Sequence, residues 1–518
     1  MTDTAAGTCT QPSKLALATK DLAQFLATHG LDAAQLPGTL GPGYEGLYSQ
    51  FPASVRAALP QLSAAQHVAV RLFFLHEDVA VDEAQEIFGE LATALLDTGL
   101  LTTGAASDTV KSDFDLRQIT PVTGTHHAGW VLSDRDASMD ANFIPGSNHV
   151  PGIGQASYSL LAATPTTPVD SLLDLGCGSG VLSLAFAHTA AHITATDISQ
   201  RALELAEASS VASGVKLELL QGSWFEPVAG RHFDRIVANP PFVIGPPEIH
   251  HVYRDSGMAL DGATEYLVRN AADYLTVGGH AHILGSWALK DGENAAEKLG
   301  SWVAPEGVSA WFGQRSRVSV QQYVHTWLED ESIDPRSSNG QAKSTQWLEY
   351  FAAHEITEIA LGFIALERLV DESEPSEVNV QEINGRDSFF GTEVAEYFTR
   401  AQWLRTVEPA EVFASTYFLR PTAKLHTIQK LSHEGMQLED ARLQRHDGIY
   451  YSQECPEHVQ AILGGVAHGT MSLGEAIRMF AHATGVAEAE LQSIVLPYVV
   501  RMVSLGLLLP ASLISSTD

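Results

Sequence analysis

The chain has 518 residues, enough for about three domains at roughly 100–200 residues each, and 45% of its residues are hydrophobic, so global disorder is excluded. Lys and Arg number 30 against 62 Asp and Glu, which gives a formal net charge of −32. So acidic a chain repels polyanions and argues against non-specific nucleic-acid binding, but it leaves room for a local basic groove.

Cysteine usage and apolar runs bound the compartment. Cys9, Cys177 and Cys455 are far apart and form no CxxC pair, so neither a disulfide framework nor a zinc ribbon is expected. The N-terminal residues lack the basic and apolar segments of a signal peptide, and no apolar run reaches the roughly 18–20 residues that span a bilayer. We expect a cytoplasmic protein.

Helical periodicity dominates the first part of the chain. Apolar residues recur at three- and four-residue spacing over residues 15–101, and Gly99 is placed to end the last of three short helices. Short strands are predicted in "LRQITPV" (116–122) and "GWVLSD" (129–134). Three helices followed by a strand pair are the order of a winged helix. We expect a helical, winged-helix-like domain over 1–119, either for packing or for substrate recognition.

The middle of the chain, 120–372, alternates strands and helices. This alternation predicts βαβ units and an α/β domain with a mostly parallel sheet covered on both faces. Strands are expected at 171–176, 192–197, 216–222, 233–239, 280–287 and 355–369, and helices at 181–188, 200–213 and 265–275. The polar stretch 329–344 is expected to be a loop, and the acidic stretch 370–379 a linker.

The last part of the chain, 373–518, is expected to form a third domain. Residues 458–510 are again helical in pattern, and the end of that stretch, "MVSLGLLLP", is similar to "LLDTGLLT" at 95–102. Both segments suit a helix that runs into a wing strand. The sequence therefore indicates a second winged-helix-like unit near the C-terminus.

A glycine-rich turn follows the predicted strand at 171–176. Gly176, Gly178 and Gly180 precede a predicted helix, and Asp174 lies two residues before the first of them. Glycines at such a place permit a tight turn and a close approach of the backbone to a ligand. Asp197 ends the next predicted strand, where a carboxylate can accept hydrogen bonds from both hydroxyls of a ribose.

Two cofactors with such a ribose, NAD and S-adenosylmethionine (SAM), compete for this pattern. NAD-binding turns have the spacing G-x-G-x-x-G and a helix N-terminus that faces a pyrophosphate. Here the spacing is D-x-G-x-G-x-G, SAM has no pyrophosphate, and its sulfonium cation suits an acidic residue. The segment resembles the first motif of class I SAM-dependent methyltransferases, which have a Rossmann-like sheet. The resemblance implies SAM as cofactor, with these contacts: Asp174, Gly176, Cys177, Gly178, Gly180, Asp197, Ile198, Ser223, Trp224 and Asn239.

The segment "FDRIVANPPF" (233–242) ends a predicted strand in an amide, two prolines and an aromatic ring. A conjugated nitrogen needs both N–H bonds held if its lone pair is to point at a methyl donor. The Asn239 side-chain oxygen and the Pro240 carbonyl can each accept one of those N–H groups. Pro240 and Pro241 restrict the backbone, and Phe242 can stack on a planar target. This pattern predicts methyl transfer to an amide or amino nitrogen.

The wider segment resembles the amino- and amide-nitrogen methyltransferases, especially the HemK-like release-factor glutamine methyltransferases. "GSWFEPVAGRHFDRIVANPPF" (222–242) and "MALDGATEYLVRNAADYLTVGG" (258–279) carry this resemblance, and "HVPGIGQASYSLLAA" (149–163) stands where those proteins cover the cofactor. Two residues depart from the family pattern. Ser223 replaces an acidic residue that contacts the adenine, and Phe242 replaces a tyrosine, as in nucleobase methyltransferases.

Other polar clusters in the sequence are weaker evidence for a functional site. The pair at 250–251 and the other histidine clusters have no partner at metal-ligand spacing, so no metal is expected. Tyr253 and Arg254 follow the motif closely and are candidate substrate contacts. Arg315 and Arg317, beside aromatic residues, form the nearest approach to a nucleic-acid patch.

These observations leave several functions open. The first is N-methylation of a protein side chain, with a glutamine amide preferred. The second is N-methylation of a nucleobase amino group in RNA or DNA, which the winged-helix-like flanks and Phe242 favour. A SAM-binding module without catalysis and a methyltransferase of a small planar metabolite are further alternatives. A macromolecular acceptor is expected as partner.

Overall fold

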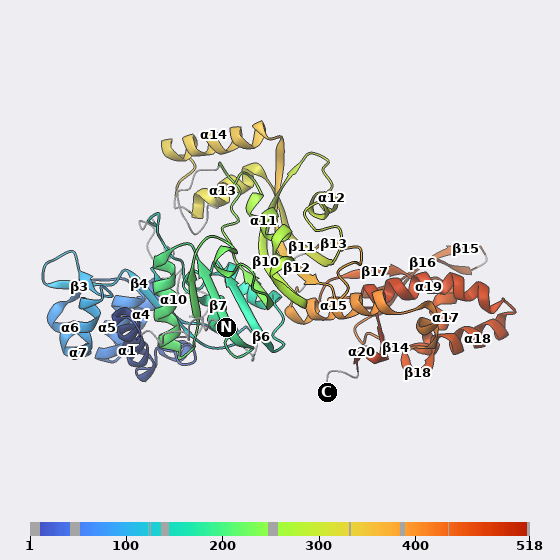
Figure 1. The fold of residues 1–518 in the computed structure, drawn as a ribbon, viewed down its shortest axis with the longest axis horizontal. Coiled ribbons are helices and arrows are strands. Elements are labelled where there is room, and N and C mark those ends of the chain that lie inside the picture. Colours follow the sequence, from blue (N-terminus) through green and yellow to red (C-terminus); the bar gives the residue numbers. More distant parts are fainter. Residues whose placement is uncertain are drawn as a thin grey trace, which may run out of the picture. The chain divides into compact units, whose positions relative to one another are not determined.

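The fold is that of a computed structural model, which describes residues 11–41, 52–122, 124, 126–135, 145–246, 257–330, 333–383, 389–433 and 435–514 (Figure 1). The chain divides into two compact units. One comprises residues 1–162 and 166–381, and the other comprises residues 163–165 and 382–518. The first unit holds the predicted sheet.

An eight-stranded sheet forms the centre of the first unit, in the order β13-β11-β12-β10-β9-β6-β7-β8. The strands are β6 (Val169–Leu175), β7 (Ala190–Asp197), β8 (Glu218–Gln221), β9 (Phe233–Ala238), β10 (Leu275–Lys290), β11 (Val308–Ser319), β12 (Ile356–Arg368) and β13 (Glu377–Glu382). Strands β8, β7, β6, β9 and β10 run parallel, whereas β12 is antiparallel to both β10 and β11. The predicted α/β class is confirmed.

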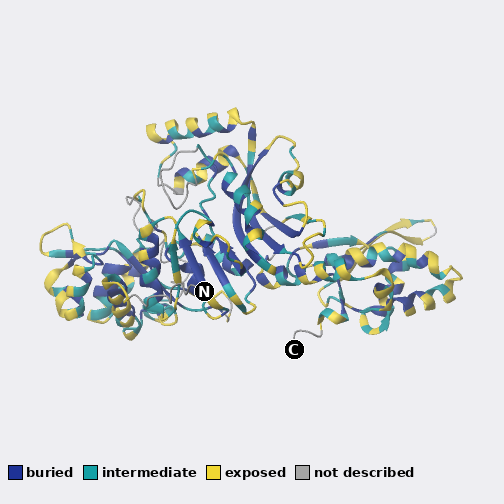
Figure 2. Ribbon diagram, in the orientation of Figure 1, coloured by how far each residue is buried: buried dark blue, intermediate teal, exposed yellow. Residues whose placement is uncertain are grey.

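The inner strands are buried because their residues are apolar on both faces, as a parallel sheet between helices requires (Figure 2). The flanking helices are α8 (Gln155–Ala163), α9 (Val181–Ala185), α10 (Gln200–Ser213), α11 (Gly262–Asn270), α12 (Ala295–Gly300), α13 (Val320–Asp330) and α14 (Ser338–Ala353), with short 3-10 turns η3 (Glu226–Val228) and η4 (Ala271–Tyr274). Helix α10 has the predicted bounds, since Ser199 caps its start and Gly214 (φ 67°) ends it.

Two predicted irregular segments contain regular structure. The expected loop at 329–344 is interrupted by α14, which begins at Ser338 because the Ser337 side chain accepts the Gly340 N–H. The expected linker at 370–379 ends in β13, which pairs with β11 at the edge of the sheet. Edge strands tolerate polar, acidic sequences because one side faces water, and this explains why composition alone suggested a linker.

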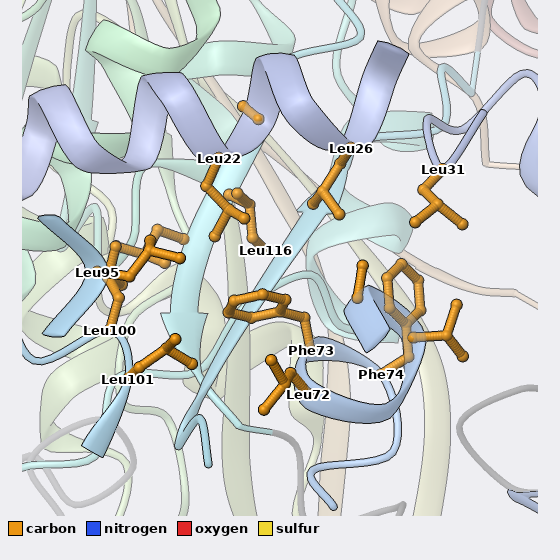
Figure 3. Close-up of a cluster of buried hydrophobic side chains, with 14 of the residues drawn as sticks. Leu22, Leu26, Leu31, Leu72, Phe73, Phe74, Leu95, Leu100, Leu101 and Leu116 are labelled. Atoms are coloured by element: carbon orange, nitrogen blue, oxygen red, sulfur yellow. The ribbon is translucent and has the colours of Figure 1, made fainter. Parts of the chain in front are cut away.

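The N-terminal part of the first unit is mainly helical. Its elements are α1 (Lys14–Thr28), α2 (Leu36–Leu40), α4 (Pro52–Ala58), η1 (Leu59–Gln61), α5 (Ala64–Phe73), β1 (Val79–Ala80), α6 (Val81–Phe88), α7 (Glu90–Asp97), β2 (Thr102–Thr103), β3 (Thr109–Lys111), β4 (Phe114–Gln118) and β5 (Trp130–Asp134). Leu22, Leu26, Phe73, Leu95 and Leu116 meet in its core (Figure 3). This core continues into the sheet region, because α10 packs on α1 and the Leu132 N–H donates to Ser209 Oγ at 2.9 Å.

The strands after the three helices differ from the predicted pair. A short hairpin, β2–β3, follows α7 directly and joins β1 in a three-stranded sheet, while the predicted strands pair separately as β4 and β5. Gly99 (φ 78°) lies between α7 and β2, as its position suggested. The winged-helix assignment of this part stays a prediction.

The second unit mixes helices with two small sheets. Its elements are α15 (Gly391–Thr406), α16 (Pro409–Ala414), β14 (Thr416–Leu419), β15 (Lys424–Ser432), β16 (Gly435–Arg445), β17 (Tyr451–Glu454), α17 (Glu457–Val466), β18 (His468–Ser472), α18 (Leu473–Thr484), α19 (Glu488–Ser504), β19 (Leu508–Pro510) and α20 (Ala511–Ile514). Arg445 is buried and pairs with Glu393. As the similarity of 95–102 to the chain end indicated, α19 runs into strand β19; a winged-helix assignment here also stays a prediction.

Every helix in the described ranges is too short or too polar to cross a bilayer.

Candidate functional site

A cavity of about 440 Å³ opens at the carboxyl ends of β6, β7, β8 and β9. Ligands of open parallel sheets bind at this edge, and the volume lies in the usual range of small-molecule sites. The walls come from residues 148–152, 154, 156 and 157; 175–179, 181 and 182; 196–199 and 202; 222–224; 239–243; and Trp327. The glycine turn and the Asn-Pro-Pro-Phe segment therefore share one cavity, although more than fifty residues separate them in sequence.

The glycine turn follows β6 and requires glycine for conformational reasons. Gly176, Gly178 and Gly180 have φ values of 73°, 54° and 87°, in the left-handed region that other residues enter at a cost. The N–H groups of Gly176 and Cys177 both donate to the Thr196 carbonyl at 2.9 Å, which fixes the turn against β7. Gly176, Cys177 and Gly178 line the cavity.

Gly180 lies outside the cavity wall and begins α9 instead. A Cβ atom there would lie 3.5 Å from the Ala206 Cβ, an ordinary van der Waals contact, so the positive φ of 87° is what favours glycine at the start of α9. Gly180 is not a residue of the cavity wall, and a cofactor contact at this position stays a prediction.

Asp197 ends β7 and lines the cavity. Its Oδ2 accepts the Gly178 N–H at 2.9 Å and its Oδ1 accepts the Ser199 N–H at 2.8 Å. Burial raises the pKa of this carboxyl, and the same N–H groups oppose the rise. Each carboxylate oxygen keeps a second lone pair, so both can still accept a hydroxyl from a ligand.

Asp174 lies beneath the turn rather than on the cavity wall. It is fully buried, and the Ser183 N–H and Oγ–H donate to its Oδ2 at 2.9 and 2.6 Å, which orients the carboxylate toward the start of α9. Its Oδ1 has no hydrogen-bond partner among the described residues. Burial raises the pKa of Asp174 to about 6, and the nearby Asp197 adds to the rise. Asp174 therefore places a carboxyl group just below the cavity wall, and its direct contact with a ligand stays a prediction.

The Asn-Pro-Pro-Phe segment leaves β9 and contributes Asn239, Pro240, Pro241 and Phe242 to the wall. Within the described part of the chain, neither the Asn239 side-chain amide nor the Pro240 carbonyl makes a hydrogen bond. Asn239 is half-buried and Pro240 is buried, and polar groups that lack a protein partner on a cavity wall are available to orient a ligand. Ser286 Oγ donates to the Phe242 carbonyl and anchors the end of the segment to β10.

Three further predicted contacts lie on the wall. Ile198 is 58% exposed, unusual for a large apolar side chain, and Ser223 and Trp224 follow β8. Trp224 has φ 48°, and its ring centroid lies 5.4 Å from that of Tyr266. An exposed isoleucine beside these residues provides an apolar surface for a flat ring.

The predicted covering segment contributes residues 148–152, 154, 156 and 157. Ser179 Oγ donates to the Pro151 carbonyl at 2.9 Å, so the segment is tied to the glycine turn. Gly152 packs so closely that a Cβ atom would lie 2.3 Å from Ser133 Oγ. This contact fixes the path of the segment across the cavity.

The remaining predicted contact residues either lie outside the described residues or are not part of the cavity wall. Tyr253 and Arg254 lie outside the described residues. The small basic patch is reduced by its neighbours: Arg317 pairs with Glu358, and Arg315 donates to Ser159 Oγ at 3.2 Å. The described ranges contain no group of three or more His, Cys, Asp or Glu side chains placed to hold a metal.

Trp327 of α13 is a wall residue that the sequence analysis missed. Its helix is an insertion between β11 and β12, far from every motif in sequence. The helical spacing of Val320, Tyr323, Val324 and Leu328 was a visible signal for a packed helix, but no local pattern indicated which of its aromatic residues faces the cavity.

The residues of this cavity fit SAM. The turn leaves backbone close to the ligand space, since a Cβ atom at Gly176 or Gly178 would meet nothing within 4 Å. Asp197 offers two acceptors to a ribose, and the unpaired Oδ1 of Asp174 lowers the local potential beneath the site, which favours a cation.

Two family models match the chain. The methyltransferase small domain matches residues 150–301. The central domain is a class I methyltransferase domain. Its cofactor is SAM, as predicted. A domain of unknown function (DUF7782) matches residues 395–510 and thus most of the second unit.

Curated relatives point to one class of enzyme. The ribosomal RNA small subunit methyltransferase C of Escherichia coli (strain K12) and that of Shigella dysenteriae serotype 1 are each 36% identical over 143 residues, which cover 27% of this chain and 38% of the relative. The chain thus spans well under half the length of the curated relatives it matches.

Solved structures with similarity include the T. thermophilus 16S rRNA N2 G1207 methyltransferase (RsmC) in complex with AdoMet and guanosine. It is 19% identical, with 49% of this chain and 66% of that chain covered and a TM-score of 0.27. A putative class I methyltransferase of Listeria monocytogenes is 13% identical, with 74% and 98% covered and a TM-score of 0.28. The HemK-like resemblance and the glutamine acceptor gain no support from these proteins.

Proposed function

We propose that the protein is a SAM-dependent N-methyltransferase whose acceptor is the exocyclic amino nitrogen of guanine in RNA. The observation that carries this proposal is the pair of acceptors, Asn239 Oδ1 and the Pro240 carbonyl, on the wall that also holds the glycine turn, neither of which has a hydrogen-bond partner among the described residues. An amino group with two N–H bonds matches two acceptors, and a planar base matches the adjoining Phe242 ring.

The cofactor half of the cavity is assigned as follows. Asp197 accepts the ribose hydroxyls, the backbone at Gly176–Gly178 lies along the cofactor, and Ile198 with Trp224 covers its adenine. Ser223 stands where relatives of the predicted family carry an acid, so its hydroxyl or the adjacent N–H takes that contact. When bound, SAM supplies a methyl group carried on a positively charged sulfonium.

The acceptor half positions the nitrogen. In guanine the lone pair of the exocyclic nitrogen is delocalised into the ring, so the amino group is a poor nucleophile until its N–H bonds are turned out of the plane. Asn239 Oδ1 and the Pro240 carbonyl hold those two N–H groups, and the prolines keep the carbonyl fixed before the acceptor arrives. The same oxygens then hold the proton that leaves.

No strong base is required of this wall. Asp197 is the carboxylate among the described wall residues, and its oxygens already accept backbone N–H groups. The nitrogen loses its proton after it has gained the methyl group and become cationic, when water or a carbonyl suffices as acceptor.

The choice of RNA rests on the relatives. Proteins 36% identical to part of this chain are named ribosomal RNA small subunit methyltransferases. Phe242 in place of tyrosine agrees with that class. The acidic charge of −32 implies that RNA is recognised through few local contacts rather than through a broadly basic surface.

A labelling experiment tests the acceptor. RNA and protein fractions from cells that lack the gene are incubated with the purified protein and SAM labelled in the methyl group, and the products are digested with nuclease or protease. We expect label that nuclease releases, and nucleoside analysis by mass spectrometry should identify it as N2-methylguanosine.

The other outcomes each exclude the proposal. Label that only protease releases, with methylated glutamine in the digest, would establish the side-chain acceptor instead. Label in small molecules alone would indicate a planar metabolite. An absence of transfer despite tight SAM binding would favour the binding-module alternative.

A further inference from the structure

Trp327 belongs to the cavity but to none of the motifs that form the rest of it. Within the described part of the chain it is the wall residue farthest along the sequence, and it is contributed by α13. Helices α13 and α14 are an insertion between the antiparallel strands β11 and β12, outside the parallel part of the sheet. The insertion therefore brings one aromatic side chain to a site built by other elements.

The insertion is fastened to the segment that follows Phe242. The Ile244 N–H donates to Tyr323 Oη at 2.8 Å, a buried hydrogen bond. A Cβ atom at Gly245 would lie 3.1 Å from the Trp347 ring, so α14 packs directly on the same segment. Val243 and Trp327 pack against one buried cluster that contains Ile244 and Tyr323. These contacts fix the position of α13 relative to the acceptor half of the cavity.

Trp327 is placed at the edge of the apolar face of its helix. Val320, Tyr323, Val324 and Leu328 are buried, while Trp327 is only half-buried and its ring centroid lies 5.9 Å from that of Tyr323. A core position would cover the whole indole. Here part of the ring packs on Tyr323 and part of the side chain lines the cavity, as a side chain with both a structural and a binding surface does.

We propose that Trp327 is a substrate-binding residue that stacks on the purine ring of the acceptor and so provides, with Phe242, the aromatic surface of the acceptor site. The inference rests on the proposed function, because an RNA base as methyl acceptor requires an aromatic surface in the site. A base taken out of an RNA stack loses its neighbours, and aromatic side chains replace them. A glutamine amide has no ring to stack and would gain little from an indole.

The size of the effect follows from base stacking. Removing one aromatic partner of a base weakens nucleic-acid binding by on the order of tenfold. Trp327 enters the cavity from α13, which is fastened to the segment after Phe242, whereas Asp197 and the glycine turn follow β7 and β6. Its loss should therefore raise the KM for RNA and leave the affinity for SAM unchanged.

The test compares Trp327→Ala and Trp327→Phe in the full-length protein. Trp403→Ala is the matched control, because Trp403 is a half-buried tryptophan of the second unit that also contacts a tyrosine edge-on, at 6.3 Å between centroids. Thermal unfolding first establishes that each variant folds. Initial rates with a short single-stranded RNA that contains guanine give kcat and KM, and calorimetry gives the Kd for SAM.

A binding measurement runs beside the kinetics. The same RNA with 2-aminopurine in place of guanine loses fluorescence when its base stacks on an aromatic ring. Wild-type protein should quench this probe, Trp327→Phe should quench it partly, and Trp327→Ala should quench it least. We expect Trp327→Ala to raise KM about tenfold, Trp327→Phe to raise it less, and Trp403→Ala to match wild type.

The outcomes separate this inference from the function on which it rests. If wild type methylates guanine but Trp327→Ala keeps its KM and its quenching, the inference is wrong and the function stands. If Trp327→Ala weakens SAM binding as much as RNA binding, the indole belongs to the cofactor half and the inference is also wrong. If wild type methylates no RNA, the function is wrong, and the quenching by wild type against Trp327→Ala still decides whether the indole stacks on a base.

Discussion

The two halves of the cavity differ in how their polar groups are satisfied. In the half built by the glycine turn, most polar groups have protein partners: Asp197 accepts the N–H groups of Gly178 and Ser199, and Asp174 Oδ2 accepts two hydrogen bonds from Ser183, although Asp174 Oδ1 has none among the described residues. In the half built by the Asn-Pro-Pro-Phe segment, the Asn239 amide has no partner in the described residues. Hydrogen bonds within the protein hold the first half in place, whereas the Asn239 amide of the second half is available to a ligand.

Because of this difference, substitutions in the first half should change ligand affinity, and substitutions in the second half should change the rate of methyl transfer. A half held by internal hydrogen bonds keeps its shape without ligand, so a change there weakens both the site and the affinity for the ligand it holds. A half whose groups are free contributes little to stability, and a change there removes interactions made only with the reacting nitrogen.

Asn239→Ala should have the largest effect and should separate the two halves most clearly. It removes the oxygen that we propose to hold one N–H of the acceptor, and loss of one such preorganised contact typically costs about a hundredfold or more in kcat. The Kd for SAM should stay within about twofold of wild type, because the substitution leaves Asp197 untouched. Single-turnover methylation and calorimetry measure the two quantities.

Asn294→Ala is the control for this substitution. Asn294 also loses a hydrogen bond, since it caps α12 by accepting the Ala296 N–H at 3.0 Å, but it lies outside the cavity wall. It should leave kcat unchanged. Equal losses of SAM affinity and kcat in Asn239→Ala would mean that the two halves are not distinct.

Asp197→Ala should act on the half of the cavity that is proposed to bind SAM. It removes the proposed ribose acceptor and leaves two N–H groups without their partner, and hydrogen bonds to a charged group are worth about 1.5–3 kcal/mol, or roughly ten- to a hundredfold in the Kd for SAM. Turnover at saturating SAM should fall far less. Glu218→Ala, which breaks the 2.7 Å pair with Arg231 outside the cavity, is the matched carboxylate control. A normal Kd in Asp197→Ala would remove this residue from the cofactor site.

Asp174 should make SAM binding depend on pH. Burial raises the pKa of this carboxyl to about 6, so the folded protein binds its proton more tightly than the unfolded chain does. Its contribution to the free energy of unfolding is therefore greatest below about pH 4 and declines by about 3 kcal/mol as the pH rises through 6. A cation bound above the turn favours the ionised form and reverses that loss.

The affinity for SAM should accordingly be on the order of tenfold weaker at pH 5 than at pH 7. Calorimetry across this range measures the dependence, and Asp174→Asn should flatten it while Ser183 still donates to the side chain. Asp197 also has a raised pKa, so an unchanged slope in Asp174→Asn would assign the dependence to Asp197 instead.

The sequence predicted the parallel part of the sheet well because the information there is local. Each buried strand is a short apolar run, and the ends of β7 and β9 at Asp197 and Ala238 follow from where those runs stop. Since parallel strands end at one edge, the two motifs could be brought together without knowledge of the packing. Helix α10 was found from its cap and its terminal glycine for the same reason.

The remaining features depend on contacts that no local pattern carries. Asp174 lies below the cavity wall and accepts two hydrogen bonds from Ser183, and no local pattern in the sequence indicated that pairing. Strand β13 is acidic enough to resemble a linker, and its pairing with β11 is a long-range choice. Trp327 reaches the cavity only because Tyr323 and Trp347 fasten the insertion to the segment after Phe242.

Cys177→Ala should give the smallest effect, and it tests whether the glycine turn only holds the cofactor. It lies on the wall, but it is only 7% exposed, and burial together with the charges of Asp174 and Asp197 raises the pKa of its thiol well above the ordinary value. A neutral, buried thiol is neither a nucleophile nor a base at neutral pH. Its contribution to the turn is made by the backbone N–H that donates to Thr196, which any residue retains.

Cys177→Ala should therefore keep both kcat and the Kd for SAM within about twofold of wild type, as should Cys455→Ala, a buried cysteine of the second unit. A large loss of turnover in Cys177→Ala alone, with normal SAM binding, would show that the thiol takes part in the chemistry and that the turn does more than hold the cofactor.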